Sequence, residues 1–185
     1  MRFALLSHRH VVVSRLFVAV WPSADVAAAV AAFERPRIDR LRWTTEDQWH
    51  VTLRFLGEVD DPAPIADALD AAPLGACAAA LGPAVTTLGR QVLCVPVGGL
   101  DALATAVVAA TAGFGRPPED RPFRGHLTLA RLRRGRGGSP AGLTGAPVEA
   151  TFPVGGIQLV RSHLGPGGPR YEDLHRVRLG SPGGP

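Results

Sequence analysis

The sequence predicts an α+β fold, and three observations lead to that prediction. Short runs rich in β-branched and aromatic residues alternate with two or three segments of helical periodicity, as in sheets packed with a few helices. The 22 glycines and 17 prolines imply many turns and argue against a bundle of long helices. With 46% hydrophobic and 19% charged residues, the chain of 185 residues should be globular and able to bury a core.

The first predicted elements are a strand and a helix. Residues Arg15–Trp21 form a short apolar run that ends at Pro22, which favours a strand. Ser23 can cap the helix that follows. The apolar face of this helix comprises Val26, Val30 and Phe33.

A second strand and a second helix are expected next. Residues Trp49–Val59 are dense in β-branched and aromatic side chains, and we expect a strand there with a turn near Gly57. The pair Asp61-Pro62 is typical of a helix start, and Ile65 and Leu69 are spaced to face the core.

The middle of the chain predicts a hairpin and the clearest helix. Two strands, Val85–Leu88 and Gln91–Val97, flank the turn Gly89-Arg90. Residues 100–112 then repeat apolar side chains with helical spacing. The residues of that face are Leu100, Leu103, Ala104, Val107, Val108 and Thr111.

The last third should be strands joined by loops. A proline-rich loop over 116–122 leads into a strand over His126–Leu132, and residues 133–147 should form a mobile surface loop. The last strand candidates are Ile157–Ser162 and Arg176–Leu179. We therefore expect one domain over residues 15–180, preceded by an extension over 1–14 and followed by a loose tail over 181–185.

The charge composition excludes several mechanisms. The net charge is +4, the pI is near 10.3, and all 20 basic residues are arginine. Without lysine, Schiff-base chemistry, a P-loop lysine and a lysine-nucleotidyl ligase are ruled out. The charge makes anionic partners plausible, although a GC-rich genome also accounts for the missing lysines. Cys77 and Cys94 are too few for a disulfide scaffold or a cysteine-rich zinc site.

The sequence predicts a cytoplasmic protein. No run approaches 18 uninterrupted apolar residues, so we expect no membrane span. The segment Met1–Leu6 is apolar with one arginine, as in a signal peptide, but His8, Arg9 and His10 interrupt it early and no small-residue cleavage site follows.

A duplicated motif carries the chemistry. His50-Val51-Thr52-Leu53 is repeated as His126-Leu127-Thr128-Leu129. Because side chains alternate across a strand, each histidine shares a face with the threonine two residues later, while the apolar residues point into the core. Each copy would thus offer one imidazole and one hydroxyl to a shared groove.

Two imidazoles and two hydroxyls suit phosphodiester hydrolysis without a metal. The ordinary histidine pKa near 6.5 lets one ring be neutral and the other protonated at physiological pH. The neutral ring can take a proton from water, and the charged ring can give one to a leaving oxygen. The threonine hydroxyls can donate hydrogen bonds to the phosphate oxygens of the transition state.

These residues resemble the 2H phosphoesterase superfamily, and within it the RNA 2′,3′-cyclic phosphodiesterase branch, often labelled 2′-5′ RNA ligase. The resemblance extends beyond the motifs and covers most of residues 15–179. It rests on four blocks, RLFVAVWP, RWTTEDQWHVTLRFLGEV, FRGHLTLARL and SHLGPGGPRYEDLHRVRL. The family implies a bilobed fold of two antiparallel sheets, related by a pseudo-two-fold axis, with helices outside and a central groove.

The resemblance also implies roles for individual residues. It makes His50 the proton donor to the leaving 3′ oxygen and His126 the base that activates water, with Thr52 and Thr128 on the phosphate oxygens. Arg131 matches an arginine that lies near the phosphate in the family. The odd offset of five would put Arg131 on the face opposite His126 unless the strand carries a bulge, so its role follows from the resemblance alone.

Further binding residues flank the two motifs. Phe55 and Tyr171 could stack a base at the lip of the groove, although packing in the core is the alternative for each. Arg124 could meet an RNA phosphate, with a solvated charge as its alternative. The family usually has proline before the second histidine, whereas Gly125 stands here and should loosen the start of that strand.

The sequence thus predicts hydrolysis of a terminal RNA 2′,3′-cyclic phosphate to a 2′-phosphate, without cofactor or metal. ATP-independent 2′-5′ ligation would be the reverse reaction. The expected partners are RNA ends with a cyclic phosphate, tRNA fragments included, and the expected state is a monomer. Alternatives are a non-catalytic RNA-end-binding protein, an enzyme for small cyclic nucleotides, and a metal-dependent hydrolase, which would need a third ligand near the motifs.

Overall fold

The computed structural model describes residues 15–133, 140–165 and 168–180. The expected extension over 1–14, the tail over 181–185 and the centre of the 133–147 loop lie outside these ranges. Within the described residues, no helix has the length and apolar character needed to cross a membrane.

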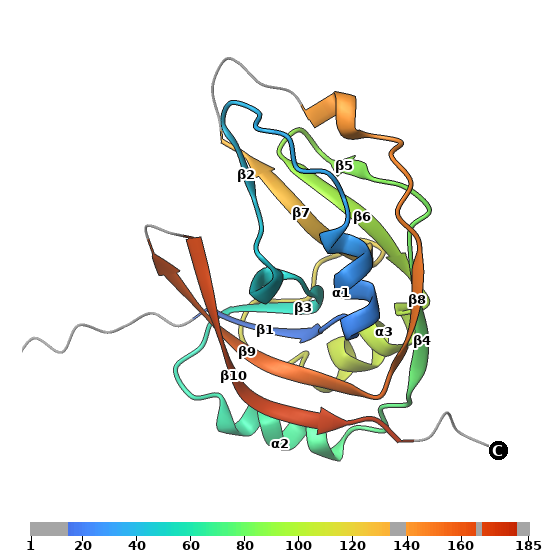
Figure 1. Ribbon diagram of the computed structural model, residues 1–185. Coiled ribbons are helices and arrows are strands. Elements are labelled where there is room, and N and C mark those ends of the chain that lie inside the picture. The colour runs from blue at the N-terminus through green and yellow to red at the C-terminus, as the bar shows by residue number, and fades with distance from the viewer. Residues whose placement is uncertain (1–14, 134–139, 166–167, 181–185) are drawn as a thin grey trace, which may run out of the picture.

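Ten strands form a curled antiparallel sheet (Figure 1). The longest path runs β10-β9-β1-β3-β7-β6-β4-β8, with β2 paired to β7 and β5 paired to β6. The strands are β1 (Arg15–Val20), β2 (Leu41–Trp43), β3 (Val51–Glu58), β4 (Cys77–Leu81), β5 (Thr86–Leu88), β6 (Val92–Gly98), β7 (His126–Leu132), β8 (Ala150–Val154), β9 (Gly156–Gly165) and β10 (Gly168–Arg178). The α+β prediction is therefore confirmed.

The two expected halves meet at the centre of this sheet. The half β10-β9-β1-β3 adjoins the half β7-β6-β4-β8 through one paired position, Val51 opposite Leu127. These two residues directly follow the two motif histidines. The two histidine motifs therefore lie where the two halves of the sheet join.

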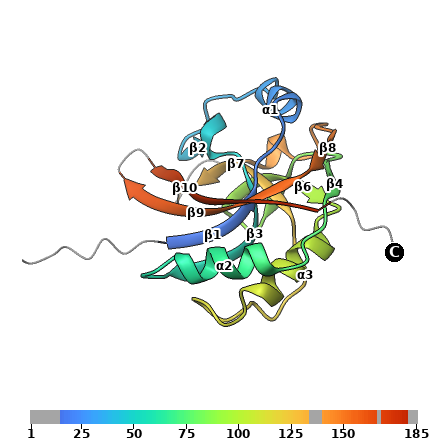
Figure 2. The ribbon, with the colours of Figure 1, turned by 90° about the horizontal axis from the view of Figure 1, so that it is seen from below.

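Three α-helices cover the sheet. They are α1 (Ala24–Ala31), α2 (Ala63–Ala71) and α3 (Asp101–Ala110), and Figure 2 shows α2 and α3 side by side on one side of the sheet with α1 on the other. Most of the expected apolar positions are buried, with Val30, Ile65 and Val107 fully enclosed, whereas Phe33, which lies beyond the end of α1, and Val108 are only partly buried. Short 3₁₀ helices, η1 (Glu46–Gln48) and η2 (Pro140–Leu143), complete the described elements.

Several sequence expectations differ from the structure. Gly57 lies inside β3 with φ +74° at a register shift against β1, so it permits a bulge rather than the expected turn. The final hairpin is longer than predicted, because β10 begins at Gly168 rather than Arg176. The described end of the 133–147 loop is ordered as η2 and a bridge between Ala84 and Pro147.

Three strands were not predicted. Cys77–Leu81 is mostly alanine and carries little β propensity, Ala150–Val154 contains a proline, and Leu41–Trp43 has only three residues. Each is positioned by pairing with a neighbouring strand, and such tertiary contacts leave no periodic pattern in the sequence.

Candidate active site

The two motif histidines lie at equivalent places in the sheet. His50 directly precedes β3, and His126 is the first residue of β7. Because Val51 pairs with Leu127 in an antiparallel register, Thr52 lies across from His126 and His50 lies across from Thr128. The two histidines and two threonines therefore occupy facing positions on the two strands.

Each imidazole is oriented by the same local hydrogen bond. Nδ1 of His50 lies 2.9 Å from the carbonyl oxygen of Gln48, and Nδ1 of His126 lies 2.8 Å from that of Arg124. A carbonyl oxygen can only accept, so Nδ1 carries the proton in both rings. The neutral form of each ring then presents Nε2 as a hydrogen-bond acceptor.

Aromatic rings surround His50. Trp21 stacks on it at 5.4 Å between ring centroids, Phe17 lies at 4.9 Å, and Tyr171 meets it edge-on at 4.9 Å. This enclosure removes water from the imidazole and, with a smaller contribution from the charge of Arg131, lowers the His50 pKa to about 4. At neutral pH the His50 ring of the free protein is therefore uncharged.

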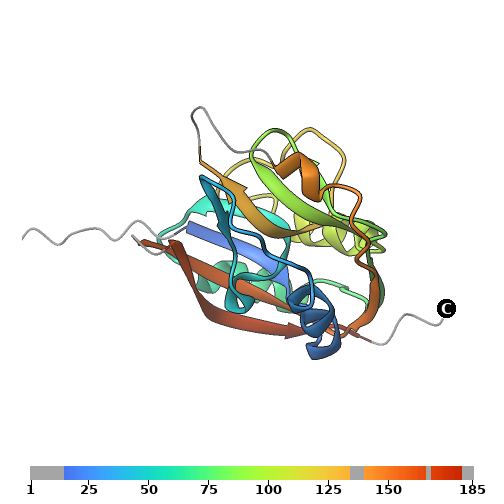
Figure 3. The same cartoon turned by 45° about the horizontal axis from the view of Figure 1, so that its top comes forward.

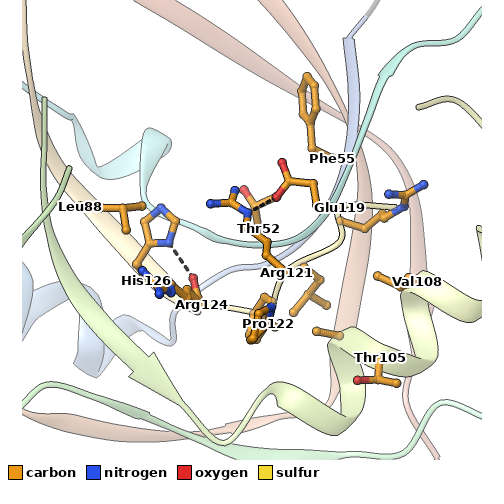
Figure 4. Close-up of a pocket in the computed structure, with 14 residues that line it drawn as sticks. Thr52, Phe55, Leu88, Thr105, Val108, Glu119, Arg121, Pro122, Arg124 and His126 are labelled. Carbon is orange, nitrogen blue, oxygen red and sulfur yellow. Dashed lines mark hydrogen bonds and ion pairs between the residues drawn. The ribbon is translucent and has the colours of Figure 1, made fainter. Parts of the chain in front are cut away.

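The surroundings of His126 are more open. Its ring lines a cavity of about 390 Å³ together with Thr52, Phe55 and Arg124 (Figure 4). Arg121 forms an ion pair with Glu119 at the same cavity. The two histidines thus share their backbone geometry but differ in their environment.

A β-bulge explains the position of Arg131. Thr128 lies opposite Cys94 and Ala130 lies opposite Leu93, so β7 holds one extra residue, Leu129, between them. Leu129 and Ala130 are consequently both buried, and Arg131 returns to the face of His126. Its charge lowers the pKa of both His50 and Tyr171, so Arg131 lies near both side chains.

The same bulge occurs in the first motif. Thr52 lies opposite Ala19 and Arg54 lies opposite Val18, so Leu53 is the extra residue in β3. Leu53 and Arg54 are both buried, and Phe55 emerges on the site face, 43% exposed. Phe55 therefore occupies in the first half the place that Arg131 occupies in the second.

The other predicted binding residues also lie beside the site. Tyr171 packs against Phe17 and His50, and burial raises the pKa of its hydroxyl. The exposed Arg124 lines the cavity beside His126 and orients that ring through its own carbonyl oxygen.

Sequence reasoning missed Trp21 and Phe17 as site residues. Both belong to the first predicted strand. Because side chains alternate between the two faces of a strand, the sequence could have shown that Phe17 lies on the face opposite the core residue Leu16. The motif gave no sign that this strand lies next to His50.

The expectation that Gly125 loosens the start of β7 is wrong. A Cβ at this position would lie 2.2 Å from the carbonyl oxygen of Val97, so the backbone packs too closely for a side chain. The backbone N–H of Val97 also donates to the Gly125 carbonyl at 2.9 Å. Close strand packing holds His126 in place.

The potential metal ligands of the described residues do not cluster. In residues 15–133, 140–165 and 168–180, no three histidine, cysteine, aspartate or glutamate side chains gather closely enough to hold a metal ion.

Comparisons with known proteins agree with this geometry. The model of the LigT-like phosphoesterase family matches residues 20–75 and 95–171. A Geobacillus stearothermophilus protein named RNA 2′,3′-cyclic phosphodiesterase is 29% identical over 92% of this chain, which spans 59% of that relative's length. A protein of the same name from Aeropyrum pernix is 32% identical over 76% of this chain and 88% of its own.

A solved structure supports the fold assignment. The protein TT0787 of Thermus thermophilus superimposes with a TM-score of 0.73 at 30% identity, over 89% of this chain and 97% of its own. The similarity therefore includes both halves of the sheet and both motifs.

Proposed function

Because the chain belongs to the LigT-like phosphoesterase family, we propose that it opens the terminal 2′,3′-cyclic phosphate of RNA to give a 2′-phosphate. Two curated relatives carry the name of this activity. The single observation that carries the proposal is the pairing of Val51 with Leu127, which brings the two motif histidines and the two motif threonines to facing positions on the two strands.

The proposed reaction is an in-line displacement at phosphorus. Nε2 of His126 accepts a proton from water while the water oxygen forms a bond to phosphorus. The bond from phosphorus to the ribose O3′ breaks, and O3′ takes the proton from Nε2 of His50. The products are a 2′-phosphomonoester and a free 3′-hydroxyl. When the 5′-hydroxyl of another RNA takes the place of water in the same displacement, O3′ leaves in the same way and the product is a 2′-5′ phosphodiester, so ligation needs no ATP.

The remaining site residues stabilise charge and hold the substrate. Thr52 and Thr128 donate hydrogen bonds to the non-bridging phosphate oxygens, whose negative charge grows in the transition state. Arg131 pairs with the phosphate from the His50 side, where its charge already acts on that imidazole. Phe55 and Tyr171 provide aromatic surfaces for a base, and Arg124 provides a charge for RNA.

The donor role requires His50 to be protonated, although its pKa in the free protein is about 4. The cyclic phosphate carries a negative charge, and its arrival beside the ring raises the His50 pKa. The reactive protonation state is therefore a minor form of the free protein that substrate binding favours. This assignment predicts that His50 gains its proton in the complex.

We also expect the protein to act as a monomer in the cytoplasm on RNA ends, tRNA fragments among them.

The deciding experiment uses purified protein and a short RNA that ends in 2′,3′-cyclic phosphate, in the presence of EDTA. Phosphorus NMR should detect a 2′-phosphomonoester as the product. Loss of turnover in EDTA that zinc or manganese restores would favour the metal-dependent alternative. Tight binding of the RNA without any turnover would favour the non-catalytic one.

A further inference from the structure

Two arginines face each other across neighbouring strands beside the site. In the pairing of β2 with β7, Arg42 lies directly opposite Arg131. Like charges in this position destabilise a sheet. Both charges act on the pKa of Tyr171, so both guanidinium groups lie on the face that carries the site. The pair therefore places two guanidinium groups together beside the site, at a distance from which one phosphate could contact both.

A cavity of about 220 Å³ adjoins this pair, and its described lining includes neither motif histidine and neither motif threonine. It lies between β2, β7 and the β9–β10 hairpin, which adjoin in Figure 3. The described residues that line it include three arginines, Arg42, Arg131 and Arg133, and no carboxylate. Asp39 lines the next hollow along, beyond Arg42 and Arg133.

The hairpin fixes the position of Arg42. Gly168 has φ +107°, and a Cβ at Gly168 would lie 1.7 Å from Nη1 of Arg42. The guanidinium therefore lies directly against the backbone of β10, in space that only glycine leaves open. A guanidinium held in this way is preorganised to bind a phosphate.

The antiparallel register gives the site a direction. Residues that follow His126 along β7 approach His50, so Arg131 and Arg42 lie at the His50 end of the groove. Residues that follow His50 along β3 approach His126, so Phe55 lies at the other end. One end of the groove is cationic, and the other is lined by an aromatic ring.

We infer that the Arg42–Arg131–Arg133 cavity binds the RNA phosphodiester that precedes the terminal nucleotide. The inference rests on the proposed function and on its assignment of His50 to the leaving O3′. In an in-line displacement the ribose is attached on the leaving-group side, so the chain on its 5′ side extends past His50. The next phosphate then reaches the cationic end, and the incoming water, or a 5′-hydroxyl in ligation, approaches from the Phe55 end.

This subsite makes the protein selective for RNA chains over small cyclic nucleotides. A trinucleotide with a terminal 2′,3′-cyclic phosphate should have a lower KM than the corresponding cyclic mononucleotide. The difference should shrink as salt rises, because phosphate contacts release counterions.

The test variant is Arg42→Gln, compared with wild type on both substrates at two salt concentrations. Loss of one charge-assisted phosphate contact should raise the trinucleotide KM about tenfold. The KM of the cyclic mononucleotide, which lacks that phosphate, should stay near the wild-type value. Arg178→Gln is the matched control, because it removes the same charge from an exposed site at the opposite end of β10 from Gly168.

Binding of a trinucleotide that ends in 2′-phosphate, measured by equilibrium titration, tests the subsite without turnover. A Kd about tenfold weaker in Arg42→Gln, with Arg178→Gln unchanged, would support the inference. Equal effects of Arg42→Gln on chain and mononucleotide, or no preference of wild type for the chain, would overturn it. Failure to hydrolyse either substrate would instead overturn the proposed function, and the titration would still decide the subsite.

Discussion

The segment HVTLRF, which leads into β3, and the segment HLTLAR in β7 share their backbone geometry but differ in what surrounds them. In both, a carbonyl two residues upstream orients the histidine, and a bulge after the threonine buries two residues in succession. The equivalent positions then diverge, with Arg54 and Phe55 in the first segment and Ala130 and Arg131 in the second. Duplication explains the shared backbone geometry, whereas the different side chains give the two histidines different environments.

The environments of the two histidines show this difference most clearly. His50 is enclosed by Phe17, Trp21 and Tyr171 and lies near the charge of Arg131. His126 opens onto the cavity shown in Figure 4. The aromatic enclosure keeps water from the His50 ring and lowers the pKa of that imidazole.

The largest expected effect comes from removing either imidazole. His50→Ala and His126→Ala should each lower kcat/KM by about two to four orders of magnitude, because each removes one partner of the proton transfers. Affinity for a 2′-phosphate product should fall much less, since Arg131 and the threonines remain. Single-turnover rates and product titration measure the two quantities, and a variant that keeps more than about a tenth of the rate would exclude its histidine from the pair.

The threonines should have the next largest effect. Thr52→Val and Thr128→Val keep the branched shape and strand preference but lose the hydroxyl donor. Loss of one donor to the transition state should reduce kcat by about 10² to 10³. Melting temperatures should be maintained, because both side chains are only partly buried. Near-normal rates in stable variants would mean that these threonines only support the strands.

The sequence predicted the placement of the two motifs on neighbouring strands better than their surroundings. The repeated motif identified both histidines and both threonines, because alternation along a strand is a local property. The bulge at Leu129 depends on pairing with β6, so the offset of Arg131 could not be read from spacing alone. The aromatic enclosure of His50 depends on which strands become neighbours, and no local pattern records that.

The difference between the two imidazoles can be tested by titration. NMR of the His50 ring should give a pKa well below its ordinary value, and the acid limb of kcat/KM should lie at correspondingly low pH, because that profile reports the free enzyme. Trp21→Leu removes the stacked ring and admits water, so the His50 pKa and the acid limb should both rise. The His50 resonance of the wild-type protein under the same conditions provides the reference. An acid limb near the ordinary histidine pKa in wild type, unmoved by the substitution, would contradict the proposed role of the enclosure.

The smallest effect concerns the residues buried by the two bulges. Ala130 is an apolar side chain and is completely buried. The equivalent residue in the first half, Arg54, is charged but only 5% exposed, and burial lowers the pKa of its guanidinium. One Nη of Arg54 donates to the carbonyl oxygen of Arg116, while its Nε has no partner among the described residues. This contact ties the loop after α3 to β3, and the Arg116 guanidinium lies over the Phe55 ring. Arg54 should therefore stabilise the aromatic end of the groove.

Arg54→Met keeps an unbranched side chain of similar length and removes the donor. The unpaired Arg116 carbonyl should cost about 1–3 kcal/mol, and relief from burying a charge should offset part of that. A net loss near 1 kcal/mol corresponds to a melting temperature about 2–4 °C lower for a chain of this size. Arg121→Met is the control, because that arginine is exposed and its ion pair with Glu119 should contribute little. KM should rise slightly with kcat unchanged, since Phe55 contacts substrate and not the reacting atoms. A melting temperature equal to or above that of wild type would contradict this prediction. It would show that burying the Arg54 charge destabilises the fold by at least as much as its hydrogen bond stabilises it, so that an apolar residue, like Ala130 in the second half, is the more stable choice at this position.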